Sequence, residues 1–219
     1  MSEDLREAVV ELQENGIEGL ILDFRFNPGG LLSSSVEVSD MFMEDAVVVS
    51  TKGRTAPEKV FETETRDVLT DAPLIVLVNQ FSASASEIFA GAVKDNNRGI
   101  IIGETTFGKG SVQSVLPLQN RGGALKLTTA AYYTPSGISI EEKGVKPHIE
   151  IPLSDQENRK LARHLSDIKR RFPDEENDEQ TLDPYPEGND ESEEDRVEDI
   201  QLQRAVDAMK ALLLSGTKR

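Results

Sequence analysis

The clearest indication of the fold class is the segment Leu74-Ile75-Val76-Leu77-Val78-Asn79-Gln80-Phe81-Ser82-Ala83-Ser84-Ala85-Ser86-Glu87. Its first five residues are all aliphatic, which is typical of a strand that is covered on both faces. A polar turn follows, and residues 84–96 then have the character of a helix. A buried strand that leads directly into a helix is the unit from which α/β folds are built.

The rest of the chain continues this alternation of strands and helices. Turn sequences such as Asn15-Gly16 and Gly122-Gly123 mark the ends of several segments. Because a buried strand, a helix and the next strand form a parallel unit, the order predicts an α/β fold with a mainly parallel sheet. The predicted helices are residues 2–14, 31–43 and 84–96, and the predicted strands are residues 17–24, 46–50, 74–78, 99–102, 112–118 and 125–133.

The charge of the chain is strongly negative but unevenly distributed. The formal net charge of the 219 residues is −16, and fourteen acidic residues against one basic residue fall between Asp174 and Asp199. The sequence offers no basic stripe for phosphate groups, which argues against nucleic-acid binding. It contains no cysteine and no apolar run of the roughly 18 residues that a membrane span needs.

The sequence after Pro152 is more polar than the rest. Residues 173–195 are acidic and contain prolines, with too few apolar side chains to fold alone. We therefore expect a core at 1–152, a charged helix at 153–172, an acidic disordered linker at 173–196 and a C-terminal helix at 197–219. In that last helix, four side chains are available to pack: Ile200, Val206, Met209 and Leu213.

A serine and a lysine in small-residue surroundings are the strongest sign of chemistry. Ser84 lies in the turn before a predicted helix, and Lys109 lies in the glycine-flanked segment 103–110. Serine attacks a carbonyl group only when a base takes its proton. A lysine is such a base when burial makes it neutral, and Phe107 and the neighbouring aliphatic strands suit that burial. The pair predicts a serine hydrolase without a catalytic histidine.

The serine cluster has other interpretations. Ser84 and Glu87 match a capping box, in which the two side chains satisfy the first amides of a helix. A nucleophile and a helix cap can share this place, because a helix N-terminus favours negative charge. Ser82 and Ser86 are competing nucleophiles that the residues alone do not exclude.

The lysine segment also has alternatives. Residues 103–109 match a phosphate-binding loop, but Gly110 stands where Ser or Thr would bind magnesium, and a strand rather than a helix is predicted next. A solvated lysine in a turn is the other alternative. His148 and His164 fit no triad or metal spacing, so we expect no metal site and no cofactor.

Four motifs in this order resemble the carboxyl-terminal processing peptidases, also called tail-specific proteases. They are LILDFRFNPGGLL at 20–32, SASASE at 82–87, GETTFGKGSVQ at 103–113 and the strand pair at 125–137, and the resemblance covers roughly residues 1–151. It implies the crotonase-like fold of that family's catalytic domain. It also implies a serine endopeptidase that cleaves near the C-terminus of polypeptides through a Ser–Lys dyad and an acyl-enzyme.

The resemblance assigns a role to each site residue. Ser84 is the nucleophile, Lys109 is first base and then acid, and Gln113 orients the lysine. The four-residue spacing of Lys109 and Gln113 would place both on one face of a strand. An oxyanion hole needs two backbone N–H groups, and the amide next to the nucleophile, that of Ala85, is one candidate. Gly30 supplies the other by resemblance.

The resemblance also implies partners and a location. We expect polypeptide substrates with apolar C-termini, no nucleotide, and a periplasmic or other extracytoplasmic location. The family's catalytic domain usually follows a PDZ domain that captures substrate. We expect this chain to lack that domain, as an N-terminally truncated fragment or a minimal variant, so a PDZ domain or an adaptor would be a separate partner. A non-catalytic peptide-binding fragment of the same scaffold is the alternative function. His148 is a departure, because the family usually has aspartate there.

Overall fold

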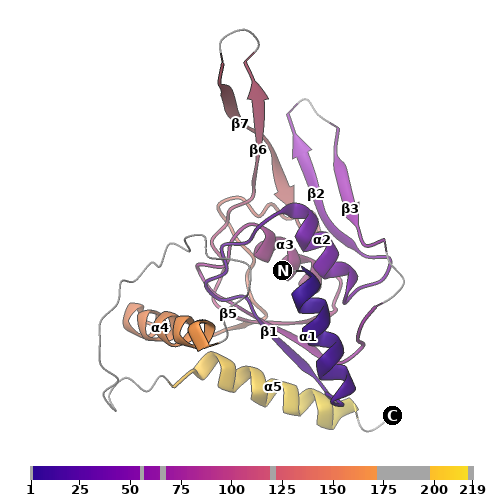
Figure 1. The fold of residues 1–219 in the computed structure, drawn as a ribbon, viewed down its shortest axis with the longest axis vertical. Coiled ribbons are helices and arrows are strands. Elements are labelled where there is room, and N and C mark those ends of the chain that lie inside the picture. The colour runs from indigo at the N-terminus through magenta and orange to yellow at the C-terminus, as the bar shows by residue number, and fades with distance from the viewer. Residues whose placement is uncertain (1, 55–56, 65–67, 119–121, 172–197, 217–219) are drawn as a thin grey trace.

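The computed structural model describes residues 2–54, 57–64, 68–118, 122–171 and 198–216 (Figure 1). A parallel sheet forms its centre, with the order β1 (Leu20–Asp23), β4 (Leu74–Val78), β5 (Gly99–Gly103) and β8 (Ile149–Glu150). All five residues of β4 are buried, as the unbroken aliphatic run predicts. The parallel sheet of the sequence analysis is therefore present.

Strand β4 has a different helix on each face, because its side chains alternate in direction. Leu74, Val76 and Val78 belong to the larger core, which also contains much of α3 (Ala85–Asp95). Ile75 and Leu77 belong to a second core with α5 (Ile200–Gly216). Both faces of β4 are thus covered.

A second sheet of equal size is antiparallel, which corrects the prediction of a mainly parallel sheet. Its order is β3 (Lys59–Glu62), β2 (Val47–Gly53), β7 (Ala124–Tyr133) and β6 (Ser111–Pro117). The strands themselves were predicted correctly, apart from the short β3 and β8. The direction in which these strands pair was not predicted correctly. Two strands joined by a short connection, such as β6 and β7, pair in an antiparallel manner because the chain reverses between them.

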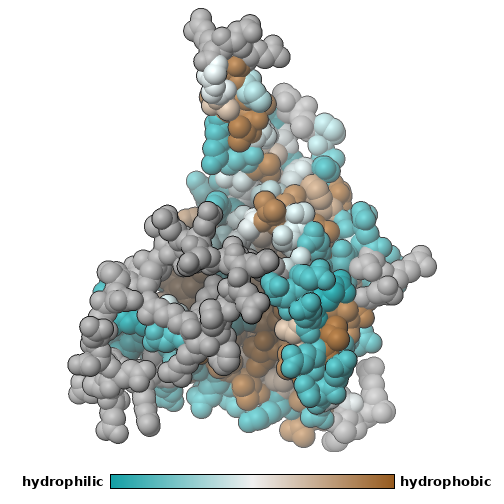
Figure 2. All heavy atoms as spheres, viewed as in Figure 1, coloured by the Kyte–Doolittle hydropathy of each residue, from teal (hydrophilic) through white to brown (hydrophobic). Residues whose placement is uncertain are grey.

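The β6–β7 pair projects from the body of the molecule (Figure 1). Its hydrophobic residues appear as brown patches on the projecting arm in Figure 2. They include four side chains that are more than two fifths exposed: Val115, Leu116, Leu125 and Leu127.

Helices α1 (Ser2–Glu14) and α2 (Leu32–Asp40) complete the larger core. Val9 of α1 is buried in it and Leu5 packs against it. Helix α1 ends before Asn15-Gly16 as predicted, and Gly16 takes a φ of 75°, a conformation that glycine adopts without strain. Helix α4 (Asp155–Arg171) matches the predicted charged helix.

The packed face of α5 agrees with the predicted one at Met209 and Leu213 but not at Ile200 and Val206. Its buried residues are Gln201, Ala205 and Met209, spaced four apart, and Leu213 packs beside them. Ile200 and Val206 are instead 38% and 36% exposed. The polar Gln201 occupies the buried face because its amide donates to the Ile151 carbonyl oxygen at 2.8 Å, a partner that the helical pattern does not reveal.

The predicted acidic linker at 173–196 lies outside the described residues. Across the parts of the chain that are described, no helix combines the length and apolar character that crossing a bilayer requires.

His148 extends the pairing of β8 with β5. Its backbone N–H donates to the Ile101 carbonyl oxygen at 2.8 Å, and the Ile101 N–H donates to His148 Nδ1 at 2.9 Å. The second bond requires a neutral ring. Partial burial lowers the pKa of His148 below its ordinary value, the charge of Lys94 lowers it further, and Asp95 opposes these effects.

This pairing predicts a pH-dependent stability. Because the folded pKa is lowered, the stabilising contribution of His148 is complete above the unfolded pKa of about 6.5 and is lost as pH falls through the folded pKa. We expect His148→Asn to flatten the dependence of the unfolding free energy on pH between about 5 and 7. Urea unfolding at several pH values measures it, with the exposed His164→Asn as the control. An unchanged slope in His148→Asn would contradict the assignment.

Candidate active site

Ser84 lies where the parallel sheet passes into α3. It is the residue before the helix, it is half-buried, and its φ of 55° and ψ of −116° are unusual for a residue with a side chain. Such backbone strain gathers at functional sites, where the surrounding structure enforces it. The turn after β4 is therefore built to hold this serine in one orientation.

The two competing serines are committed to backbone partners. The Ser82 hydroxyl donates to the Phe24 carbonyl oxygen at 2.8 Å, and the Ser86 hydroxyl donates to the Asn27 carbonyl oxygen at 3.1 Å. Both are at least 98% buried. Within the cluster, Ser84 is the serine that solvent reaches.

A buried carboxylate joins the serine turn to the lysine segment. Glu87 has no exposed surface, and its Oε2 accepts from the backbone N–H groups of Ser84 at 2.9 Å and Lys109 at 2.8 Å. Its Oε1 accepts from the Thr106 hydroxyl at 2.5 Å and the Gly108 N–H at 2.7 Å. The predicted capping role of Glu87 is confirmed, but the same side chain also fixes the segment that carries Lys109.

The lysine segment continues as a strand. β6 begins at Ser111, so the helix that a phosphate-binding loop requires after Lys109 is replaced by the predicted strand. The Phe107 N–H donates to the Ser82 carbonyl oxygen at 3.0 Å, which ties this segment to the serine turn a second time.

The expected burial of Lys109 is not seen in this structure. Lys109 is exposed, and the Phe107 side chain, which was expected to help cover it, is 65% exposed. The reason is that the backbone of the segment is turned inward to Glu87, which leaves the two long side chains outside. What covers Lys109 must come from elsewhere if it acts as a base.

The strand argument for Gln113 is wrong. Lys109 precedes β6, and a register shift between Val112 and Gln113 interrupts the alternation of side chains. Gln113 is exposed, and its amide donates to the Thr128 hydroxyl of β7 at 2.6 Å. Its proposed role as the residue that orients Lys109 rests on the family resemblance alone.

The glycine turn after β1 lies against the serine turn. Gly29 has a φ of 87°, and a side chain there would approach the Ala83 carbonyl oxygen to 2.3 Å and the Ala85 nitrogen to 2.6 Å. Gly30 has open space instead. In the described parts of the chain, neither the Gly30 N–H nor the Ala85 N–H has a hydrogen-bond acceptor. Both expected oxyanion donors are thus uncommitted, and Gly29 is the glycine that close approach requires.

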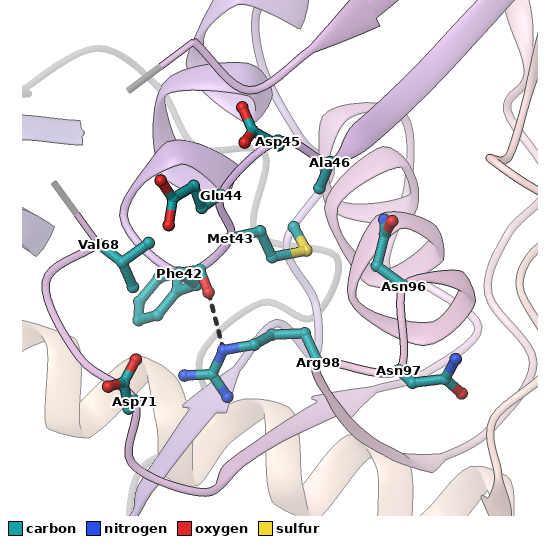
Figure 3. A pocket seen from close by; sticks show the side chains of 10 residues that line it. All are labelled: Phe42, Met43, Glu44, Asp45, Ala46, Val68, Asp71, Asn96, Asn97 and Arg98. Atoms are coloured by element: carbon teal, nitrogen blue, oxygen red, sulfur yellow. Dashed lines mark hydrogen bonds between the residues drawn. The ribbon is translucent and has the colours of Figure 1, made fainter. Parts of the chain in front are cut away.

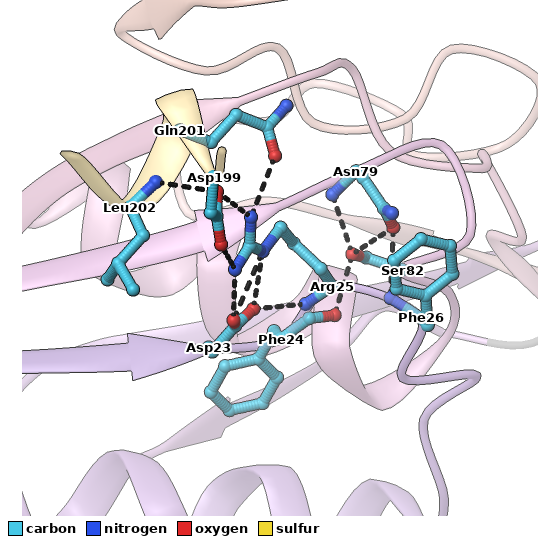
Figure 4. A network of polar contacts seen from close by, with 9 residues as sticks. All are labelled: Asp23, Phe24, Arg25, Phe26, Asn79, Ser82, Asp199, Gln201 and Leu202. Carbon is cyan, nitrogen blue, oxygen red and sulfur yellow. Dashed lines mark hydrogen bonds and ion pairs between the residues drawn. The ribbon is translucent and has the colours of Figure 1, made fainter. Parts of the chain in front are cut away.

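Sequence reasoning missed Arg25 near this site. Its side chain has no exposed surface and contacts Asp23, two residues earlier, through Nε at 2.9 Å and Nη2 at 2.5 Å (Figure 4). The sequence did contain a sign of this contact, because Asp23 and Arg25 follow the aliphatic residues 20–22 directly. Charged side chains are rarely buried unless they are paired.

A separate hollow lies at the other end of α3. This cavity of about 590 Å³ is lined by residues around the end of α2, the start of β2 and the end of α3, including Phe42, Asn96 and Arg98 (Figure 3). None of its lining residues is a candidate site residue. In the described ranges, no group of three or more His, Cys, Asp or Glu residues is arranged to hold a metal ion.

The four bonds of Glu87 lead to a stability prediction. Glu87→Gln keeps the size of the side chain but turns an NH₂ donor toward two existing donors. We expect a loss of about 3 kcal/mol in unfolding free energy, because bonds to a buried charged group are among the strongest. Thermal unfolding measures this as a fall of about 6–12 °C in Tm. The exposed Glu37→Gln is the control, and equal Tm values for the two variants would contradict the arrangement.

Curated relatives of this chain are processing proteases. The chain is 46% identical over 160 residues to the carboxy-terminal-processing protease of Bartonella bacilliformis. The aligned residues cover 70% of this chain and 37% of that protein. It is 41% identical over 152 residues to the carboxyl-terminal-processing protease of Synechocystis sp., covering 68% of this chain and 35% of that protein. The chain thus spans less than two fifths of the length of these relatives.

A solved structure shares the fold and much of the sequence. It is the photosystem II D1 C-terminal processing protease, with a TM-score of 0.65 and 38% identity over 68% of this chain and 39% of that one. The profile of peptidase family S41 matches residues 1–151, which contain the parallel sheet, Ser84 and Lys109. The chain belongs to peptidase family S41.

Proposed function

We propose that this chain is the catalytic region of a serine endopeptidase that cleaves polypeptides near their C-termini, with Ser84 and Lys109 as a dyad. The observation that carries the proposal is the shared oxygen of Glu87, which accepts from the backbone N–H of both residues. The backbone N–H groups of a serine and a lysine that lie 25 residues apart are thus held at one oxygen atom, which supports a dyad of their side chains.

The proposed reaction uses this arrangement in two halves. Neutral Lys109 takes the proton of Ser84 Oγ, and Oγ attacks the carbonyl carbon of the scissile peptide bond. The N–H groups of Gly30 and Ala85 hold the resulting oxyanion, and the new ammonium of Lys109 protonates the leaving amine. Water, deprotonated by Lys109, then attacks the ester on Ser84; the bond from the acyl carbon to Oγ breaks, Lys109 returns the proton to Oγ, and the new C-terminus is released.

The exposure of Lys109 assigns a role to the substrate. A lysine acts as a general base only in its neutral form. Desolvation lowers the pKa of a lysine, so a polypeptide laid over the site would produce the neutral base. We propose that bound substrate supplies this burial, and that Gln113 orients the lysine once substrate is present.

Exposed apolar side chains beside the site support an apolar substrate. Leu31 follows Gly30 and is 71% exposed, and Phe107 precedes Lys109 by two residues and is 65% exposed. We propose that they contact apolar residues at the substrate's C-terminus. By likeness to the family, the crotonase-like core, an upstream PDZ domain or adaptor and an extracytoplasmic location belong to this proposal too.

The dyad is tested by mass spectrometry of an unfolded protein with an apolar C-terminus after incubation with this chain. We expect cleavage near that C-terminus, and we expect Ser84→Ala and Lys109→Ala to lower kcat by about a thousandfold or more. The control variants are Ser215→Ala and Lys210→Ala, which remove an exposed serine and an exposed lysine on α5.

Two outcomes would count against this function. Unchanged cleavage by Ser84→Ala would place the chemistry elsewhere. Substrate binding without product by the unmodified chain would instead identify a non-catalytic peptide-binding fragment.

A further inference from the structure

A residue beyond the family-matched region completes the charged cluster at the base of the candidate site. Asp199 lies directly before α5, and its carboxylate accepts from Arg25 through Nη1 at 2.8 Å and Nη2 at 2.7 Å. Gln201 Oε1 accepts from Nη1 at 3.2 Å. The family profile ends at residue 151, so both contacts come from the segment that follows it (Figure 4).

Arg25 depends on this second carboxylate. Its side chain has no exposed surface, whereas those of Asp23 and Asp199 are 32% and 14% exposed. Burial alone would lower the pKa of Arg25, but the bonds to Asp23 and Asp199 raise it overall. A buried guanidinium group needs acceptors for its donors. Asp199 and Gln201 accept from Nη1, which Asp23 does not reach, and Asp199 shares Nη2 with Asp23.

The neighbours of Arg25 in the chain hold the serine turn. The Phe24 carbonyl oxygen accepts from the Ser82 hydroxyl at 2.8 Å, and the Phe26 N–H donates to Asn79 Oδ1 at 3.0 Å (Figure 4). Phe26, with a φ of 59°, stacks on Phe81 with ring centroids 5.3 Å apart. Arg25 therefore lies between two residues, Phe24 and Phe26, that hydrogen-bond to the turn that carries Ser84.

The same loop continues into the expected oxyanion hole. The Asn27 carbonyl oxygen accepts from the Ala83 N–H at 3.0 Å, and the Asn27 side chain accepts from the Gly29 N–H at 2.9 Å. Only a short stretch of hydrogen-bonded backbone separates Arg25 from Gly29 and Gly30. A displacement of Arg25 would thus also displace these two glycines.

We propose that Asp199 is a positioning residue of the peptidase site, which acts by holding Arg25 and thereby fixing the loop 24–30 against the serine turn. The proposal rests on the proposed function for its catalytic consequence. It makes the docking of α5, through a segment outside the family match, a condition for an ordered site.

Amide hydrogen exchange of the whole chain tests the structural half without any need for activity. We expect Asp199→Asn to speed exchange about tenfold or more in the loop 24–30 and the turn 79–86, while β2 keeps its protection. Asp207→Asn is the matched control, because it removes the same charge from the exposed face of α5, where Asp207 pairs with Arg204 at 3.6 Å. Asp199→Glu, which retains the carboxylate, should restore much of the protection.

Kinetics test the catalytic half. We expect Asp199→Asn to lower kcat about a hundredfold with little change in KM, because a small misplacement of the oxyanion donors affects the chemical step rather than capture. Arg25→Lys, which keeps the charge but loses the bidentate contact, should give a similar loss. Combining the two substitutions should add little, since they break one connection.

The outcomes separate the two proposals. Unchanged exchange in both loops, or a uniform increase that includes β2, would overturn the positioning role, as would full kcat in Asp199→Asn. A third outcome separates the proposals: the unmodified chain shows no cleavage, but Asp199→Asn still speeds exchange only in the loop 24–30 and the turn 79–86. That result would overturn the peptidase function and retain the structural link from Asp199 to the loop.

Discussion

The site depends on one buried carboxylate. An ionised group without water is stable only if the protein supplies its hydrogen bonds, and Glu87 has four donors from two segments of the chain. Because these donors belong to the serine turn and to the lysine segment, satisfying the charge requires that both segments fold against each other. The cost of burying Glu87 thereby becomes a constraint on the geometry of the site.

The surrounding fold makes that constraint effective. Strand β4 is buried on both faces and delivers Ser84 to the start of α3, where the Glu87 side chain turns back to the serine amide. The neighbouring strand β1 delivers the glycine turn to the same edge, since the two strands are parallel and paired. In a parallel sheet, the loops after adjacent strands meet at one edge, which is where ligands of α/β proteins usually bind.

Two charged groups therefore support different parts of the candidate site. Glu87 binds the serine turn and the lysine segment from within the core, and Arg25 supports the glycine loop with carboxylates from β1 and from the start of α5. The two side chains of the proposed dyad are less enclosed than these supporting groups: Ser84 is half-buried and Lys109 is exposed. Accessible side chains above a hydrogen-bonded base are consistent with the proposed polypeptide substrate.

Most of the local elements could be predicted from the sequence, which also identified Ser84 and Lys109 as the candidates for the proposed chemistry. The aliphatic run 74–78, the helix after Ser84 and the helix before Gly16 follow from short-range patterns of burial and turns, which neighbouring residues decide. Four features follow from long-range packing instead: the antiparallel second sheet, the exposure of Lys109, the hydrogen bond of Gln113 to Thr128 and the contact of Arg25 with Asp199. Each of these depends on which segments meet in space. The separation of Arg25 and Asp199 by more than 170 residues shows why no local pattern could reveal such a contact.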